Sequence, residues 1–488
     1  MSLAAGAMGW NESADEVRSL GWRRVLVTGL AQAVVFSAAL GLRLVGLGTW
    51  SFWGDELVTF YDGRMILSQD YWNPGPYSPP HEVFIHAAPI GWAILGAWHR
   101  VCDGSEFAVR LPVAVASALA VAAVVVLAWR SRGGWVATAL ALLLILWPWN
   151  LFHAQNHRVY SFAYLFGAVG CVLADAGFAG RCGRKIAAAG IVLTLAALTH
   201  NVAGLMLGLM IGWHAVLVLT DRANWSVRSL AWQAPAVTGL AVNAILFRRF
   251  TPDYPVGLHW YTPAGCAMSM AFNIGLPVLL AAGAGAAWVV VARRRDLYWN
   301  VAAAGGVATA AVCVPMISTF RPDYLFALTA PVHILAAVGI AEVARRAWSA
   351  HRLLSAGVLA VVPLLTAPSV LSYYVDGDRP DFRGATEWLQ GQIQPGDVVW
   401  SNQCMNVNHY LGIQAARSYP KQPAAEARDI LNRNGRVWVV DSFSTAGVDP
   451  RKLAWLRDDF RLQTVVQRTR YDYHQNGIGV WLAGHPPG

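Results

Sequence analysis

Two adjacent carboxylates, Asp55 and Glu56, follow directly on a strongly apolar segment, at the end of the run Trp-Ser-Phe-Trp-Gly-Asp-Glu (50–56). Neighbouring carboxylates near a low-dielectric surface push each other's pKa values apart, which favours one of them as a general base. The same pair could instead hold a divalent cation, Mg²⁺ or Mn²⁺, through its oxygens, or form a solvated loop between interfacial tryptophans. The residues predict acid/base chemistry at a membrane surface; a metal ion stays open as an alternative, and no other cofactor is indicated.

Two further segments combine a cation with a tyrosine between apolar runs. Arg158 is followed by Tyr160, and Arg321 by Tyr324. An arginine at a membrane face is suited to bidentate contact with a phosphate. Arg248 and Arg249 add a third cationic point. Each alone is more typical of a lipid-headgroup anchor, but the three together, facing one acidic loop, favour a phosphate-binding site.

Histidines supply the remaining titratable groups. His81 and Glu82 follow two prolines at a predicted helix start, which is either a site element or an interfacial helix end. His153 and His157 have the i, i+4 spacing of a metal-ligand pair, without an apparent third ligand. His200 interrupts an apolar stretch, and either is a buried, hydrogen-bonded histidine or belongs to the site.

The composition assigns the chain to a class. Of its 488 residues, 56% are hydrophobic and only 13% are charged, whereas soluble globular chains have about 25% charged residues. The net charge of +9 comes from short arginine clusters between apolar runs, which is a signal of membrane orientation rather than of nucleic-acid binding. The sequence therefore predicts an integral membrane protein that contacts lipids and no nucleic acid.

Eleven apolar runs are long enough to cross about 30 Å of hydrocarbon. They lie near 24–46, 110–130, 134–152, 159–180, 186–200, 201–220, 229–247, 268–292, 298–317, 324–344 and 352–371. A further run, 83–101, is ambiguous. If it does not cross, all basic clusters lie on one side of the membrane, as the positive-inside rule requires. We therefore expect juxtamembrane or re-entrant helices at 80–101, within a long external loop, 47–111.

This topology divides the chain into three parts. Residues 1–23 are expected to be a cytoplasmic N-terminus and 24–371 a transmembrane domain. After residue 371 charge density rises and helical and strand patterns alternate, which predicts a small external α/β domain, 372–488. Its expected helices are 383–392, 405–411, 424–432 and 450–459, and its expected strands 397–401, 436–441, 462–468 and 477–483.

Four sequence segments resemble a known family. They are LRLVGLGTWSFWGDE, SPPHEVFIHAAPIGWAILGAWHRVCDGSEFAVRLP, NHRVYSFAYLF and RPDYLFALTAPVHILAAVGIA. Together they are similar to motifs of the membrane-embedded GT-C glycosyltransferases of the protein O-mannosyltransferase, aminoarabinose-transferase and Rgt-like group, over roughly 24–345. The resemblance implies a polytopic α-helical GT-C fold with juxtamembrane helices in the first external loop, and a polyprenyl-phosphate sugar as donor.

The resemblance also implies roles for individual residues. Asp55 matches the family's catalytic base, with Glu56 beside it, and Arg158 and Tyr160 match residues near the donor phosphate. Where the family has a basic residue before the two prolines, this chain has Ser78, so His81 is the candidate to replace it.

The function predicted from these observations is an inverting glycosyltransferase. It would move a sugar from a polyprenyl-phosphate donor to a lipid, glycan or protein acceptor on the periplasmic face of a bacterial inner membrane. The alternatives are a transporter or flippase of lipid-linked saccharides, and a glycan polymerase or ligase. Transporters need ionisable groups near the bilayer midplane, whereas here polar residues gather at the predicted external ends of the spans.

Overall fold

The structure is a computed structural model. It describes residues 14–65, 88–250, 262–316, 321–376, 381–412, 416–418, 423–433, 435–442, 461–469 and 476–483. His81, Glu82 and the predicted helix 450–459 lie outside the described residues.

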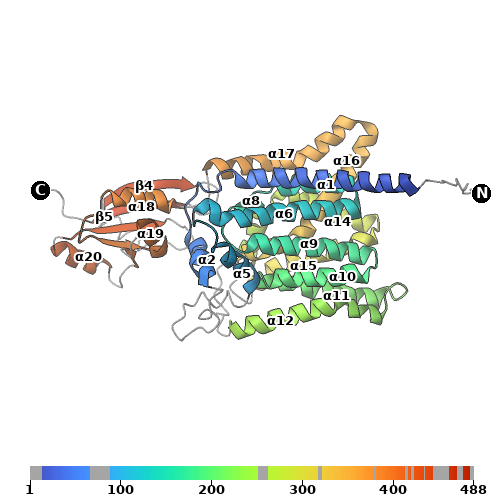
Figure 1. Ribbon diagram of the computed structural model, residues 1–488, viewed down its shortest axis with the longest axis horizontal. Helices are drawn as coiled ribbons and strands as arrows, with labels where there is room; N and C mark the ends of the chain where they lie inside the picture. Colours follow the sequence, from blue (N-terminus) through green and yellow to red (C-terminus); the bar gives the residue numbers. More distant parts are fainter. Residues whose placement is uncertain are drawn as a thin grey trace, which may run out of the picture.

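A bundle of long helices forms the body of the molecule, and an α/β domain stands at one end of it (Figure 1). The bundle helices are α1 (Ala14–Leu44), α6 (Glu106–Arg132), α7 (Gly134–Ile145), α8 (Pro148–Ala154), α9 (Tyr160–Ala179), α10 (Gly183–Ala197), α11 (Gly204–Thr220), α12 (Ala234–Phe250), α13 (Pro263–Ile274), α14 (Leu276–Val291), α15 (Tyr298–Cys313), α16 (Ala330–Ala350) and α17 (Arg352–Asp376). Short 3-10 helices connect some of them: η1 (Asn201–Ala203), η2 (Val227–Gln233), η3 (Arg295–Leu297), η4 (Val314–Met316) and η5 (Pro322–Leu328).

The predicted apolar runs all fall on these helices, and the chain is an integral membrane protein. Within the described ranges, six helical segments are long and apolar enough to cross a membrane, or up to eight if each of two bent pairs counts as one span. The predicted number of eleven crossings is thus higher than the six to eight that helix length and apolar composition support. One reason is that α10 has only 15 residues.

The two bent pairs correct the prediction of single straight spans. The run 134–152 is α7 and α8, bent by 59°, and the run 268–292 is α13 and α14, bent by 94°. Pro148 begins α8, and Gly275 joins α13 to α14 with a φ of 94°. Proline favours a helix start and glycine accepts positive φ without strain, so each bend has a local sequence cause.

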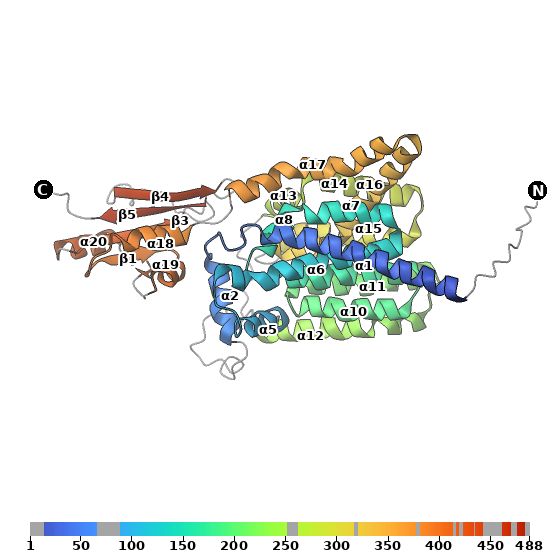
Figure 2. The ribbon, with the colours of Figure 1, turned by 45° about the horizontal axis from the view of Figure 1, so that its top comes forward.

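Two short helices lie at the end of the bundle next to the α/β domain (Figure 2). They are α2 (Gly54–Met65) and α5 (Pro89–Trp98). At 1.5 Å per residue, the ten residues of α5 extend only about 15 Å, half of the hydrocarbon thickness. This agrees with the expected juxtamembrane helix in the first loop. We call this the domain end of the bundle, and the opposite end, where α6, α14 and α16 finish in arginine clusters, the basic end.

Helix α16 lies inside the bundle, since its residues 330–341 are all buried. Such burial is typical of a helix that is apolar on every side. It approaches α14 closely at two glycines. A Cβ at Gly285 would stand 2.0 Å from the Leu335 carbonyl oxygen, and one at Gly339 would stand 2.8 Å from that of Ala281. Small residues permit such backbone contact between membrane helices.

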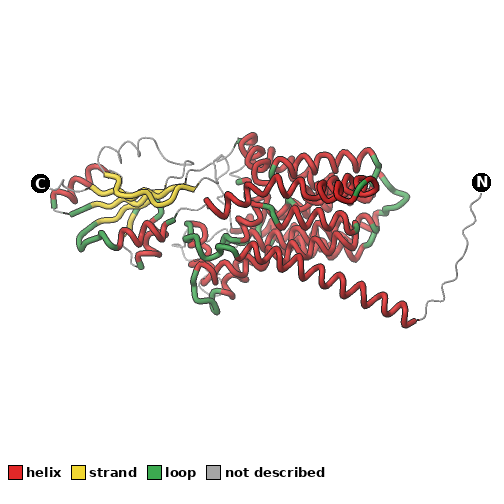
Figure 3. The backbone as a smooth tube through the Cα atoms, turned by 90° about the horizontal axis from the view of Figure 1, so that it is seen from above, coloured by secondary structure: helices red, strands yellow, loops and turns green. Residues whose placement is uncertain are grey.

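The C-terminal α/β domain contains a five-stranded sheet in the order β2-β1-β3-β5-β4 (Figure 3). Its elements are α18 (Phe382–Gln390), β1 (Val398–Ser401), α19 (Cys404–Leu411), β2 (Ala416–Arg417), α20 (Pro423–Asn432), β3 (Val437–Ser442), β4 (Arg461–Thr469) and β5 (Asn476–Ala483). Strand β1 pairs in parallel with β2 and β3, whereas β5 pairs antiparallel with β3 and β4. One hydrophobic cluster joins Phe382 and Leu389 of α18 to the sheet, and another joins Ala427 of α20 to Trp400. The short strand β2 has no counterpart among the predicted elements.

Candidate active site

Asp55 and Glu56 lie in the first turn of α2, where the helix dipole favours negative charge. Successive residues of an α-helix point about 100° apart, so the two side chains leave the helix in different directions. The Asp55 side chain is 41% exposed, and that of Glu56 is fully buried. The carboxylates therefore do not form one joint site.

Glu56 is held by an arginine from α6. Arg110 donates from Nε to Oε1 at 2.9 Å and from Nη2 to Oε2 at 2.7 Å, and is itself fully buried. The His157 backbone N–H also donates to Glu56 Oε1, at 2.6 Å. Both oxygens of this carboxylate already accept hydrogen bonds, so neither is available to take a proton from a substrate. We therefore revise the expectation of a catalytic Glu56 to that of a positioning residue.

Arg110 also fixes the segment that leads into α2. It donates to the carbonyl oxygens of Leu47, Trp50 and Ser51 at 3.1, 2.7 and 3.1 Å. One buried guanidinium thus ties the end of the first span, the entry to α2 and Glu56 together. The sequence leaves open whether Arg110 is an interfacial anchor or orients the first external loop, and these contacts favour the second alternative.

Asp55 faces two arginines from separate loops. Its Oδ2 lies 3.9 Å from Arg158 Nη2 and 4.0 Å from Arg321 Nη1. Both distances exceed hydrogen-bonding range, so the guanidinium groups flank the carboxylate without saturating it. The structure thus brings Asp55, Arg158 and Arg321 together.

Each arginine has other contacts that hold it in place. Arg158 Nη1 donates to the Asp55 carbonyl oxygen at 3.0 Å and to Thr59 Oγ1 at 2.9 Å. Its guanidinium carbon stands 5.5 Å from the centre of the Trp92 ring of α5, a cation–π arrangement. Arg321 donates from Nη2 to Asp323 at 2.9 Å. These contacts aim both cations at the space beside Asp55.

Tyr160, His200 and Tyr324 form a row of rings behind these arginines. The Tyr160 and His200 ring centres are 5.1 Å apart, and those of His200 and Tyr324 are 5.2 Å apart. Burial lowers the pKa of His200 to about 4, so the ring is neutral at pH 7. Its Nδ1 is buried and has no hydrogen-bond partner among the residues that the structure describes. The structure thus brings three predicted site residues together from α9, η1 and η5.

His157 has a partner that sequence reasoning missed. Its Nε2 lies 2.9 Å from Nε2 of His99, just beyond the end of α5. Burial is the main cause that holds the pKa of His157 well below its usual value, with the neighbouring His99 adding to it. Within the described ranges, no group of three His, Cys, Asp or Glu side chains is arranged to hold a metal ion, and His157 meets His99 rather than forming a ligand pair with His153.

The α/β domain contacts the segment just before Asp55. The Phe52 N–H donates to Tyr410 Oη at 2.5 Å, and Asn406 Nδ2 donates to the Phe52 carbonyl oxygen at 2.8 Å. Tyr410 Oη in turn donates to Glu106 at 3.0 Å. Gly54 lies against Gln403, because a Cβ there would stand 2.9 Å from the Gln403 amide oxygen. Helix α19 therefore covers the entry to α2, which no local sequence signal indicates.

Comparison with solved structures shows which fold carries this site. ArnT from Cupriavidus metallidurans in the apo state has a TM-score of 0.56 at 14% identity, with 95% of this chain and 98% of ArnT covered. The form bound to undecaprenyl phosphate has a TM-score of 0.53 at 15% identity, covering 94% and 98%. The fold is therefore that of the GT-C membrane glycosyltransferases, as the sequence resemblance predicted.

A second group of similar structures comes from an archaeon. The Archaeoglobus fulgidus oligosaccharyltransferase, tethered with an acceptor peptide, has a TM-score of 0.52 at 12% identity, covering 84% of this chain and 69% of that chain. No protein-family model and no curated protein sequence matches the chain. At such low identity the shared feature is the fold.

Proposed function

We propose that this protein is an inverting glycosyltransferase that takes a sugar from a polyprenyl-phosphate donor and passes it to a lipid, glycan or protein acceptor. The site would lie on the periplasmic face of a bacterial inner membrane, at the domain end. The observation that carries the proposal is the half-exposed Asp55 carboxylate with two guanidinium groups, Arg158 and Arg321, each about 4 Å from it.

The arrangement suits a displacement at an anomeric carbon. An acceptor hydroxyl would approach opposite the lipid phosphate, and Asp55 would take its proton as the new glycosidic bond forms. The bond from the anomeric carbon to the phosphate oxygen breaks, and the leaving phosphate carries away the negative charge. Arg158 and Arg321 would stabilise that charge where it develops. Their contacts with Asp55 are longer than hydrogen bonds, so guanidinium N–H groups remain available to the phosphate.

The similar structures support the choice of donor. ArnT was solved with undecaprenyl phosphate, and the archaeal oligosaccharyltransferase AglB with a dolichol-phosphate and an inhibitory peptide. Both ligands are polyisoprenyl phosphates, which are the products that a lipid-linked sugar donor would leave. The row of rings formed by Tyr160, His200 and Tyr324 would lie beside such a ligand if the two arginines bind its phosphate.

The test is the release of free polyprenyl monophosphate from a monosaccharide-charged lipid when acceptor is added to the purified protein. A positioned proton-transfer group contributes about 10²–10⁴-fold. We therefore expect Asp55→Asn to lower turnover by at least about 10²-fold, with donor binding retained. Asp103→Asn is the matched control, because Asp103 is an acidic residue of the same loop whose carboxylate accepts hydrogen bonds from the backbone N–H and hydroxyl of Ser105. Near-normal turnover of Asp55→Asn would refute the assigned role.

The same assay separates the alternatives. A transporter would move the charged lipid without releasing monophosphate, and a polymerase or ligase would require an oligosaccharide donor. The bend between α13 and α14 resembles the broken helices of transporters, yet residues 263–291 contain no charged side chain. The Asn273 carbonyl, next to the bend, accepts a hydrogen bond from Trp147 Nε1 at 2.9 Å. The bend thus has a structural explanation.

A further inference from the structure

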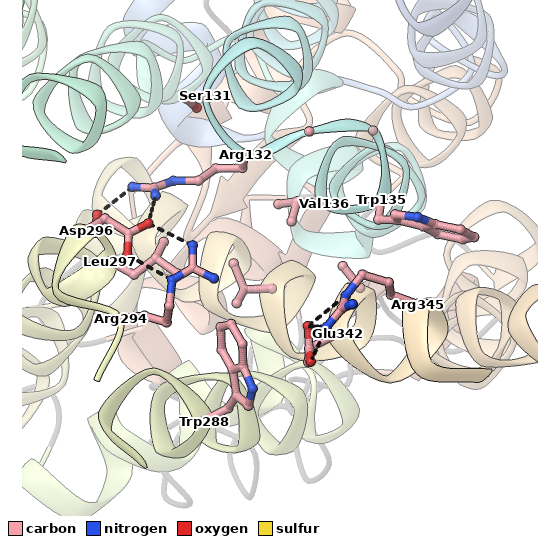
Figure 4. A pocket seen from close by; sticks show the side chains of 14 residues that line it. Ser131, Arg132, Trp135, Val136, Trp288, Arg294, Asp296, Leu297, Glu342 and Arg345 are labelled. Atoms are coloured by element: carbon pink, nitrogen blue, oxygen red, sulfur yellow. Dashed lines mark hydrogen bonds and ion pairs between the residues drawn. The ribbon is translucent and has the colours of Figure 1, made fainter. Parts of the chain in front are cut away.

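A cavity of about 260 Å³ opens at the basic end, far along the bundle from Asp55, where α6, α7, α14 and α16 meet (Figure 4). Its polar lining includes Arg132, Arg294 and Arg345, and its aromatic lining Trp135 and Trp288. Tryptophan is enriched where membrane helices reach the headgroup layer. The cavity therefore combines cations and interfacial aromatics.

Carboxylates hold the arginines in position around the cavity. Asp296 accepts bonds from Arg132 Nη1 at 2.5 Å and from Arg294 Nε and Nη2 at 3.0 and 2.9 Å. Glu342 accepts bonds from Arg345 Nη2 at 2.8 Å and from Arg346 Nε at 3.0 Å. Each carboxylate thus binds two arginines, so each group of one carboxylate and two guanidinium groups has a net charge of +1.

A third carboxylate, Asp175, reduces the surplus without removing it. It accepts from Arg132 Nε and Nη2 at 2.9 and 2.6 Å. Four guanidinium groups therefore share three carboxylates around this cavity. The Arg294 guanidinium carbon also stands 5.4 Å from the centre of the Trp288 ring (Figure 4).

We propose that this cavity binds the phosphate of an anionic glycerophospholipid from the membrane leaflet at the basic end. Guanidinium groups pair well with phosphate oxygens, and clusters of basic residues beside membrane helices attract anionic lipids. The volume suits a headgroup and is below the range of about 300–1,000 Å³ that encloses a whole small-molecule ligand. The acyl chains would follow exposed apolar side chains of the same helix ends, including Val290, Val291 and Val343.

The test uses the purified full-length protein in a neutral detergent and no glycosyl donor, so its outcome is independent of the proposed activity. Thermal unfolding is followed while dioctanoyl phosphatidylglycerol, dioctanoyl phosphatidylcholine or inorganic phosphate is added. We expect a saturable rise in the unfolding midpoint with phosphatidylglycerol, because a ligand that binds the folded state stabilises it. Phosphatidylcholine and inorganic phosphate should give much smaller rises at equal concentration.

A double variant, Arg294→Gln/Arg345→Gln, assigns the effect to the cavity. Arg132 remains on Asp296 and Arg346 remains on Glu342, so neither carboxylate loses its last arginine. The apparent Kd for phosphatidylglycerol should rise at least ten-fold. The control Arg130→Gln/Arg228→Gln removes the same charge from exposed residues outside the cavity and should leave the Kd unchanged.

The proposal would be overturned by equal stabilisation by both lipids, by an unchanged Kd in the double variant, or by an equal loss of affinity in the control. Stabilisation by inorganic phosphate as large as that by phosphatidylglycerol would also overturn it, in favour of a site for free phosphate. If the double variant does not fold, Arg345→Gln alone serves, with a rise in Kd of about three-fold expected and no change counting against the proposal.

Discussion

The two ends of the helical bundle use buried charge in opposite ways. At the basic end, carboxylates and arginines are shared: Arg132 contacts both Asp175 and Asp296, and Asp296 contacts both Arg132 and Arg294. At the domain end, Arg110 has one carboxylate partner among the described residues, Glu56, and both side chains are fully buried. The domain end also has a shared group, in which Arg321 lies near both Asp55 and Asp323, but that group is partly exposed. In the described part of the chain, its fully buried ion pair is the single one between Arg110 and Glu56.

The difference is related to what each end has to do. A network with several partners tolerates the loss of one and can present surplus cations to a ligand. A single buried pair fixes one backbone segment rigidly, and here that segment carries Asp55. Asp55 is half-exposed, and its carboxylate makes no hydrogen bond to the two arginines near it. The backbone segment can therefore hold Asp55 at a defined position while its carboxylate stays available for proton transfer.

The largest effect should come from breaking the single pair. Glu56→Ala leaves the Arg110 charge buried and uncompensated, which costs about 3–5 kcal/mol of stability. Asp175→Ala, at the basic end, should cost less, because Arg132 keeps Asp296. Denaturant or thermal unfolding of the purified variants in detergent measures both. If the two variants lose equal stability, the contrast between single pair and network is wrong.

The sequence predicted more of the helical frame than of the site's interior. Apolar runs predicted where the bundle helices lie, but not the number of spans or the two bends. Together with the arginine clusters, they also indicated that Asp55, Arg158 and Arg321 lie on one side, since all three follow span ends on the same predicted side. The difference in burial between Asp55, which is half-exposed, and Glu56, which is fully buried, was not predictable from the sequence. It depends on which face of α2 packs against α6, which is a property of the tertiary structure.

The missed partners are distant in sequence. Arg110 lies 54 residues from Glu56, His99 lies 58 from His157, and Tyr410 lies 358 from Phe52. No periodicity or capping rule links positions so far apart. The same limit explains the two bends, where Pro148 and Gly275 could be seen in the sequence but the resulting angles could not.

A smaller effect is expected where the α/β domain holds the entry to α2. Tyr410→Phe removes the acceptor of the Phe52 N–H and the donor to Glu106, so a part-buried backbone group is left unpaired at a cost of about 1–3 kcal/mol. Turnover in the monophosphate-release assay should fall with it, since Asp55 is three residues from Phe52. The control Arg417→Gln breaks an exposed ion pair of the same domain and should change stability by about 1 kcal/mol or less. Equal effects of the two variants would show that α19 does not position this segment.

The smallest effect concerns pH and the buried pair of His157 and His99 behind Glu56. The pKa of His157 is lowered in the folded protein, mainly by burial, whereas an unfolded chain has a histidine pKa of about 6.5. Above pH 6.5 both states are neutral at this ring and stability is unaffected. As the pH falls below 6.5, the unfolded chain takes up a proton that the folded ring refuses, so stability decreases by about 1.4 kcal/mol per pH unit for this group.

Unfolding in detergent between pH 8 and pH 5 measures this dependence, and His157→Gln should make the acid side of the profile shallower. His200, whose pKa is also lowered by burial, keeps some slope in that variant. The hydrogen bond between the two Nε2 atoms needs one ring to donate and the other to accept, so protonation of both rings would break the link between α5 and the segment that follows α8. A profile with the same acid slope in wild type and His157→Gln would show that this pair does not make the domain end sensitive to acid.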